Sequence, residues 1–86
     1  MESYKKAFQI AKDWILDNKG KNYFLYEEAT EEMKNGWLFY YFASNKKNSY
    51  SNYPLFIDKH NARVVLINSF FKESMIEEYE KSQGYK

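Results

Sequence analysis

The sequence predicts an α+β fold in which an N-terminal helix packs on a four-stranded antiparallel meander sheet and a short C-terminal helix follows. Three observations predict it. Apolar residues recur at helical spacing over residues 3–18 and again over residues 72–81. Between these segments lie four short runs rich in aromatic and aliphatic residues. The links between the runs are short, which favours antiparallel pairing of consecutive strands within a single domain, residues 1–86.

The first helix has a start signal, an apolar stripe and a stop signal. Ser3 is expected to cap it, because its side chain can accept a hydrogen bond from a first-turn amide. Gly20 is expected to end it in the left-handed conformation. The stripe that should face the sheet contains Tyr4, Ala7, Phe8, Ala11, Trp14, Ile15 and Asn18.

The strands are expected over residues 22–27, 37–43, 53–58 and 62–68. The polar residues 28–36 fit either a loop or a continuation of the first strand into a hairpin. Asn35 and Gly36 predict the turn, because both residue types tolerate a positive φ. Pro54 has no N–H to donate, so it indicates an edge or an end of the sheet. Residues 59–61 are expected to turn the chain into the fourth strand.

The second strand does not alternate between apolar and polar residues, as a sheet with one wet face would. Its side chains form two sets that point to opposite faces: Trp37, Phe39 and Tyr41 to one, and Leu38, Tyr40 and Phe42 to the other. One helix covers one face only. The second face must therefore meet the C-terminal helix through Met75, Ile76 and Tyr79, or a second copy of the chain, or a foreign partner.

Composition argues against several function classes. Lys plus Arg number 13 and Asp plus Glu number 12, and this balance disfavours nucleic-acid binding and attraction to an anionic membrane. Cysteine is absent and His60 is the one histidine, so we expect no disulfide, no metal centre and no cofactor. No apolar run reaches the length of a secretory leader or a membrane span, which favours the cytoplasm, most simply a bacterial one.

The candidate catalytic groups do not combine into a reactive set. The carboxylates of residues 27–32 lie in a polar segment without a predicted dry pocket, so solvated charge is the preferred interpretation. His60 and Asp58 could form a proton-transfer pair, but an exposed turn histidine is the preferred interpretation. The sequence contains no Gly-x-Ser-x-Gly motif and no glycine-rich phosphate loop. We therefore expect no enzymatic activity.

Aromatic residues make up 21 % of the chain, which is more than the core of so small a domain needs. Some rings should reach the surface. Because aromatic residues are enriched in the cores of protein interfaces, this excess predicts a protein-binding surface. A stacking platform for single-stranded nucleic acid is the weaker interpretation, since the chain has no basic excess.

Three segments, residues 31–41 (EEMKNGWLFYY), 52–59 (NYPLFIDK) and 76–79 (IEEY), lie in an order and at a spacing that resembles a known family. This family is the small bacterial YrhB-like domain, which is grouped with a predicted toxin-immunity family, immunity protein 35. The resemblance covers nearly the whole chain. Two positions depart from the pattern, because Ser51 and Asn61 stand where the family usually has glycine. Asparagine tolerates a positive φ, so the turn at Asn61 is expected to survive.

The resemblance implies a small cytoplasmic protein that neutralises a toxin or a peptidase by binding it. A self-associating domain of chaperone-like or structural type, with a homodimer on the spare face, is the alternative. The resemblance, with the strand pattern, marks seven residues as structural: Glu31, Gly36, Trp37, Phe39, Tyr41, Pro54 and Asp58. The three aromatic residues of this set should anchor the hairpin to the first helix, and Glu31 should receive hydrogen bonds from a turn or a Tyr hydroxyl.

The expected contacts with the partner come from the opposite face and from the polar loop at residues 44–52. Four residues are predicted there: Tyr40, Phe42, Tyr50 and Tyr53. If the first helix covers the other face of the sheet, the anchoring set and the contact set exchange roles.

Overall fold

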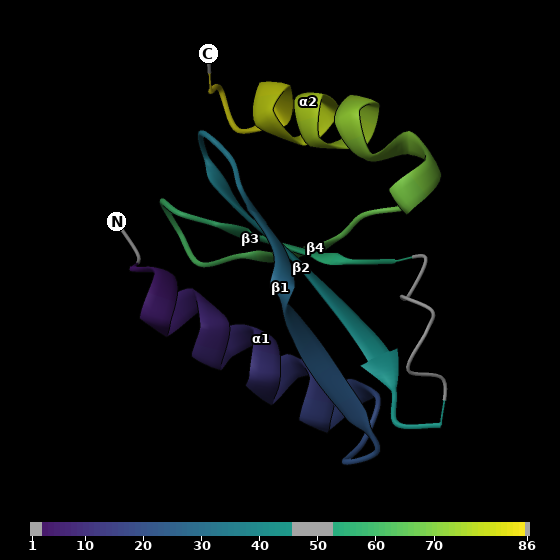
Figure 1. Cartoon of the computed structure of the whole chain (residues 1–86). Coiled ribbons are helices and arrows are strands. Elements are labelled where there is room, and N and C mark those ends of the chain that lie inside the picture. Colours follow the sequence, from purple (N-terminus) through teal and green to yellow (C-terminus); the bar gives the residue numbers. More distant parts are fainter. Residues whose placement is uncertain (1–2, 46–52, 86) are drawn as a thin grey trace.

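Two helices lie on opposite sides of a four-stranded sheet, so the chain forms three layers (Figure 1). The computed structural model describes residues 3–45 and 53–85. Its elements are α1 (Tyr4–Asn18), β1 (Tyr23–Glu32), β2 (Gly36–Ala43), β3 (Leu55–Asp58), β4 (Val64–Leu66), a 3₁₀ turn η1 (Ser69–Phe71) and α2 (Lys72–Ser82). The strands are antiparallel in the order β1-β2-β3-β4, which confirms the predicted fold class.

Helix α1 begins and ends as its sequence predicts. The Ser3 side chain accepts a hydrogen bond from the Lys6 amide at 3.2 Å, which satisfies one of the unpaired donors of the first turn. Ala7, Ala11 and Ile15 are buried on the face that meets the sheet. Gly20 follows the helix with a φ of +98°, a conformation that costs glycine little.

Strand β1 extends beyond the predicted residues 22–27. The polar residues after it, which fitted either a loop or the strand, continue the strand to Glu32. Tyr26 pairs with Tyr40, and Glu31 pairs with Leu38. The register shifts between these two pairs, as it does at a β-bulge. The pairing of β1 with β2 is therefore irregular in the middle of the hairpin. The part of β1 after this irregularity carries the charged residues and continues to the hairpin turn.

The turn of this hairpin differs from the prediction. The chain reverses over residues 33–35, and the Met33 amide donates to the Gly36 carbonyl at 2.8 Å. Neither Asn35 nor Gly36 has a positive φ. Gly36 is needed for another reason, because a Cβ at this position would lie 2.6 Å from the Ile57 carbonyl oxygen and would also meet the Phe56 ring.

Strands β3 and β4 are shorter than the predicted residues 53–58 and 62–68. Pro54 precedes β3, which is a central strand, and its carbonyl accepts from the Ile67 amide at 3.0 Å. Pro54 thus marks the end of a strand and not a sheet edge. In the turn before β4 the positive φ, +63°, belongs to Ala62 and not to Asn61. The Asn61 side chain instead accepts from the Arg63 amide.

The closing helix is confirmed close to its predicted bounds. Asn68 caps the preceding 3₁₀ turn by accepting from the Phe70 amide at 2.9 Å. Ile76 is buried, and Met75 and Tyr79 pack against the same cluster, as predicted.

The sheet separates two hydrophobic cores. On one side α1 packs against Trp37, Phe39 and Tyr41 of β2 together with Leu55 and Ile57 of β3. On the other side Ile76 of α2 packs against Leu38, Phe56 and Ile67. Both faces of β2 are thus buried near the hairpin turn, which explains why this strand is apolar throughout.

Candidate interaction surface

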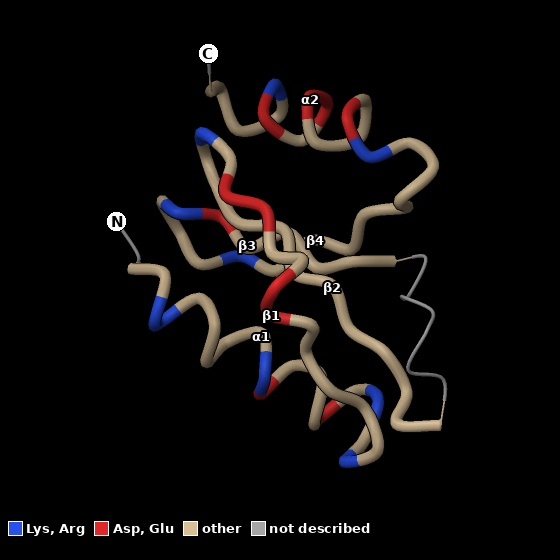
Figure 2. Tube along the Cα trace, viewed as in Figure 1, with Lys and Arg blue, Asp and Glu red and all other residues tan. Residues whose placement is uncertain are grey.

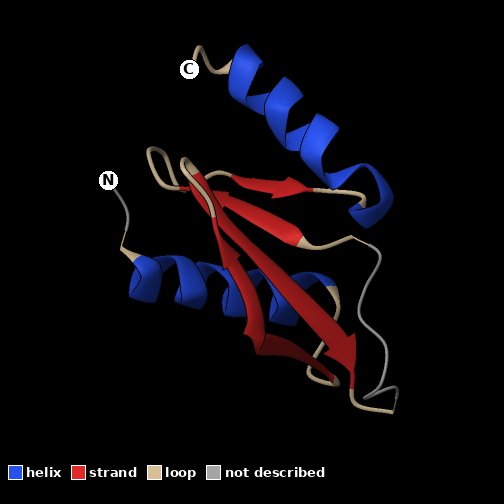
Figure 3. Ribbon diagram, turned by 45° about the horizontal axis from the view of Figure 1, so that its top comes forward, coloured by secondary structure: helices blue, strands red, loops and turns tan. Residues whose placement is uncertain are grey.

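The second face of the sheet is only partly covered by α2. Leu38 and Phe56, which lie against this helix, are fully buried. Figure 3 shows α2 over the hairpin turn of β1 and β2, while the opposite end of both strands extends past it. On that extension Phe24 is 50 % exposed. An apolar part of the sheet therefore remains open to solvent.

Four aromatic residues of β1 and β2 share this part of the face, and we call them the aromatic arm surface: Phe24, Tyr26, Tyr40 and Phe42. Phe24 pairs with Phe42 across the two strands, and their ring centroids lie 6.1 Å apart. The Tyr26 ring meets the edge of the Phe42 ring at the same distance, with an interplanar angle of 77°. Such tilted and edge-on contacts hold the rings in fixed positions.

A shallow hollow of about 330 Å³ lies beside these rings, and Glu27 and Glu28 line it together with Leu25, Tyr26 and Phe42. The hollow therefore combines aromatic walls with a negative rim. This combination suits a positively charged side chain of a partner, which gains both cation–π and ionic contacts.

The predicted contact residues occupy different environments. Phe42 is half-buried within the aromatic arm surface. Tyr40 lies at its border, where it packs against the α2 core and adjoins Lys72. Tyr53 precedes β3 and is 53 % exposed. Tyr50 lies outside the described residues.

The residues expected to anchor the hairpin lie under α1. Trp37, Phe39 and Tyr41 are buried in the α1 core, and the Tyr4 ring lies about 6 Å from the rings of Trp37 and Phe39. Helix α1 therefore covers the face of Trp37, Phe39 and Tyr41, as first expected, so the anchoring set and the contact set keep their roles.

Glu31 has a different partner from the one expected. Its two carboxylate oxygens accept from the Lys72 ammonium group at 3.1 and 3.3 Å. The hydrogen bond to Glu31 raises the pKa of Lys72. This ion pair joins the distal half of β1 to the first residue of α2.

Removing this ion pair is expected to have a small effect. Glu31→Gln should lower the free energy of unfolding by about 0.5 kcal/mol, because partly exposed ion pairs contribute little in water. A double-mutant cycle with Lys72→Met, followed by urea denaturation, measures the coupling. Glu77→Gln in the exposed Glu77–Lys81 pair of α2 is the matched control. A loss above about 2 kcal/mol for Glu31→Gln would contradict this assignment.

Asp58 forms a buried polar centre with three hydrogen-bond donors. It is fully buried, although carboxylates rarely are. Its Oδ2 accepts from the hydroxyls of Tyr79 at 2.6 Å and Tyr85 at 2.8 Å, and its Oδ1 accepts from the His60 amide at 2.6 Å. We call these contacts the Asp58 clasp. They connect the end of β3 to the last turn of α2 and the residues after it.

The clasp changes the pKa values of its members. Burial alone raises the pKa of Asp58, but the hydrogen bonds from Tyr79, His60 and Tyr85 outweigh it, so the pKa of Asp58 is lowered. Burial and the bond to Asp58 raise the pKa of Tyr79 to about 12. Asp58 is therefore charged and Tyr79 neutral at pH 7.

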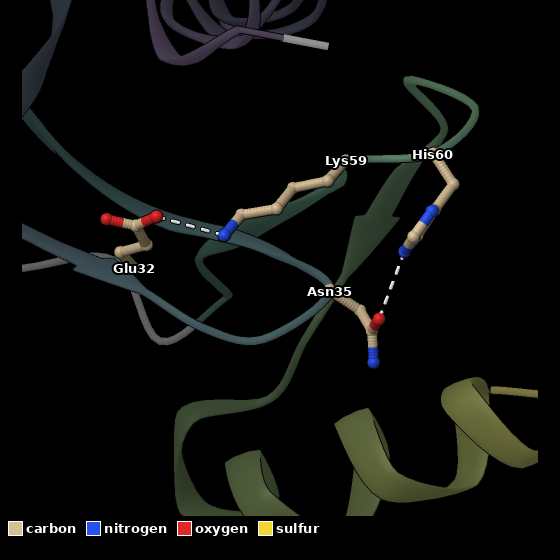
Figure 4. Close-up of polar contacts among 4 residues, drawn as sticks. All are labelled: Glu32, Asn35, Lys59 and His60. Carbon is tan, nitrogen blue, oxygen red and sulfur yellow. Dashed lines mark hydrogen bonds and ion pairs between the residues drawn. The ribbon is translucent and has the colours of Figure 1, made fainter. Parts of the chain in front are cut away.

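A second row of polar contacts extends the clasp, and Figure 4 shows part of it. Asn35 donates to Glu80 at 2.8 Å, and its side-chain oxygen lies 3.0 Å from His60 Nε2. Lys59 pairs with Glu32 at 2.9 Å, and its ammonium group lies 5.0 Å from the centre of the Trp37 ring. The hairpin turn, the β3–β4 turn and α2 are thus joined at one end of the sheet.

The geometry of the clasp is that of a structural centre. The lone pairs of Asp58 are occupied by three donors, and the His60 ring contacts Asn35 and the Tyr85 ring instead of Asp58. The two groups therefore do not form the proton-transfer pair considered from sequence. Sequence reasoning marked Asp58 as structural but did not give its partners, because Tyr79 and Tyr85 follow Asp58 by 21 and 27 residues.

Over residues 3–45 and 53–85, no cluster of three or more acidic or histidine residues is suited to hold a metal ion. Over the same ranges no helix is long and apolar enough to cross a bilayer.

Charge is unevenly distributed although the whole chain is nearly neutral (Figure 2). The acidic residues concentrate on β1 and α2: Glu27, Glu28, Glu31, Glu32, Glu73, Glu77, Glu78 and Glu80. Lysines outnumber aspartates over α1 and the residues after it, where Lys5, Lys6, Lys12, Lys19 and Lys21 stand with Asp13 and Asp17. The glutamates of β1 serve both sides of the sheet, since Glu27 accepts from the Tyr4 hydroxyl of α1 and Glu31 pairs with Lys72 of α2.

Comparisons with known proteins give no relative for this chain: no family model matches it, and no curated protein or solved structure is significantly similar to it. The resemblance to the YrhB-like domain therefore stays a prediction.

Proposed function

We propose that this chain is a non-enzymatic binding protein of the immunity or inhibitor type, which neutralises a toxin or a peptidase by occluding its surface. The observation that carries the proposal is the aromatic arm surface, where paired rings stay partly exposed beyond the end of α2. Aromatic side chains supply large contact areas at a low cost in conformational entropy, which suits the core of an interface. The family resemblance supports the same function, and it favours the bacterial cytoplasm as the place of action.

The negative rim of the hollow defines the partner further. Glu27 and Glu28 beside the Tyr26 and Phe42 rings favour a partner that presents a lysine or an arginine at the contact. The acidic residues of neighbouring α2 extend the same field, so association should be faster at low ionic strength.

The test is co-expression with the product of the adjacent gene. Wild-type chain is expected to rescue growth if that product is toxic, and Phe42→Lys is expected to abolish the rescue. Phe70→Lys is the matched control, because Phe70 is 78 % exposed but lies on η1, away from the aromatic arm surface. A lack of rescue by the wild-type chain, or equal loss with both variants, would refute the proposal.

A self-associating domain of chaperone-like or structural type remains the second candidate. The position of β1 as the first strand in the order of the sheet favours it, because an edge strand can accept a further strand.

A further inference from the structure

A groove of about 500 Å³ lies between α1 and the first residues of β1. Most of the side chains that line it are apolar: Phe8, Ile15, Leu16, Tyr23, Phe24 and Leu25. Leu16 is 57 % exposed and Phe24 is half-exposed, so the apolar lining is open to solvent. A volume of this size lies in the range of small-molecule sites, which is about 300–1,000 Å³.

The groove ends at the turn between α1 and β1. Gly20 and Lys21 line this end, and the Tyr23 amide donates to the Gly20 carbonyl at 3.4 Å. Because the chain turns there, β1 has no extended backbone before Tyr23 with which a partner strand could pair. The groove therefore offers an occupant its side chains and not a strand edge.

The charged side chains of the groove leave an excess of positive charge. Lys12 and Lys21 contribute two positive charges to the lining, and Asp13 contributes one negative charge. The Gln9 amide donates to the Asp13 carboxylate at 3.0 Å, so this carboxylate already has a donor. The Lys12 ammonium group lies 5.6 Å from the centre of the Phe8 ring, which places this cation beside the apolar lining.

We propose that this groove binds a free, unbranched fatty carboxylate of medium chain length. The alkyl chain would lie against the apolar lining, and the carboxylate would pair with Lys12 and Lys21. Phe8 and Leu16 are eight residues apart on α1, so the apolar lining extends about 12 Å along the helix, the extended length of roughly ten carbon atoms.

The two parts of such a ligand have separate tasks. Removal of the alkyl chain from water supplies the affinity, because it buries apolar surface of both the ligand and the groove. The two ammonium groups supply the selectivity, because they favour an anionic head group over a neutral or a cationic one. A small-molecule ligand at this place goes beyond the proposed binding of a protein partner.

An NMR titration of the whole chain with decanoate, below its micelle concentration, tests the site. The amide signals of residues 8–16 and 20–25 are expected to shift, with a dissociation constant on the order of 100 μM. Decyltrimethylammonium has the same chain and the opposite charge, so it should bind roughly tenfold more weakly. Binding of both amphiphiles with equal affinity, or shifts confined to other residues, would overturn the proposal.

Substitutions in the lining separate the apolar contact from the charge. Leu16→Glu should abolish decanoate binding, because it places a carboxylate in the apolar lining. Leu66→Glu is the matched control, because Leu66 is 47 % exposed but lies on β4, outside the groove. Equal effects of these two variants would refute the site, and circular dichroism shows whether each variant is folded.

The double variant Lys12→Gln and Lys21→Gln tests the head-group contact. It should weaken decanoate binding by roughly tenfold and leave the binding of neutral decanol unchanged. Lys5→Gln with Lys19→Gln is the matched control, since these two lysines do not line the groove. Decanoate binding that is insensitive to the first pair of substitutions, or equally sensitive to both pairs, would show that the groove does not recognise the carboxylate.

Discussion

Asp58→Ala is expected to lower the free energy of unfolding by about 3 kcal/mol, because it removes the acceptor of three hydrogen bonds at once. The substitution leaves the Tyr79 hydroxyl and the His60 amide without their partner beside a position that is fully buried. For a domain of this size the midpoint of thermal unfolding should fall by about 12–24 °C. Urea denaturation followed by circular dichroism measures the change.

Asp17→Ala is the matched control, since Asp17 is an exposed aspartate on α1 and should change stability by less than about 0.5 kcal/mol. Tyr79→Phe removes one donor and leaves Asp58 partly satisfied, so it should cost less than Asp58→Ala. Equal stability of Asp58→Ala and Asp17→Ala would show that the clasp does not hold α2.

The Asp58 carboxylate also makes the free energy of unfolding depend on pH in the acidic range. The pKa of Asp58 is lower in the folded chain than its ordinary value of 3.8. Its contribution to stability is therefore complete above about pH 3.8, and it is lost as the pH falls through the lower folded pKa. In Asp58→Asn this part of the acid sensitivity should disappear, which unfolding curves between about pH 2 and 6 can show.

Gly36→Val is expected to be the second most damaging change, with a loss of about 3 kcal/mol or more. Any Cβ at this position would press on the Ile57 carbonyl oxygen at 2.6 Å and on the Phe56 ring. Gly36 pairs with Asp58, so the strain would act directly on the β2–β3 ladder and on the clasp. Because backbone lies in the way, a side-chain rotation cannot relieve it.

Gly84→Ala separates this steric requirement from an ordinary glycine effect. Gly84 has a φ of +79° and nothing within 4 Å of its Cβ position, so alanine there should cost only about 1 kcal/mol, from backbone conformation. Thermal unfolding of the two variants gives the comparison. A Gly36→Val midpoint as high as that of Gly84→Ala would contradict the close packing.

The sequence predicted the layers of this fold because their signals are local. The stripe on α1, the unbroken apolar run of β2 and the closing helix each follow from spacing within one segment. The hairpin turn lies at the predicted place, but neither residue takes the positive φ that it tolerates, because Gly36 is required by contact with a neighbouring strand and not by its own conformation. The same holds for the turn before β4, where Ala62 takes the positive φ although Asn61 suits it better.

The candidate sites were harder to predict because they depend on distant pairs. Phe42 was expected at the surface from strand alternation alone, but its pairing with Phe24 depends on the register of β1 and β2. The burial of Asp58 could not be inferred, because its tyrosine donors come from a separate element. The balanced net charge likewise did not indicate that glutamates concentrate on β1 and α2.

The Asp58 clasp also affects the order of assembly during synthesis. The sheet and α1 can form from residues 3–66, but the hydroxyl donors of Asp58 leave the ribosome later, with Tyr79 and Tyr85. Until α2 has formed, the Asp58 carboxylate stays hydrated, and Leu38 and Phe56 are not covered by that helix. The nascent chain should therefore pass through a stage with one completed core and one bare apolar face, when binding by a chaperone would protect it most.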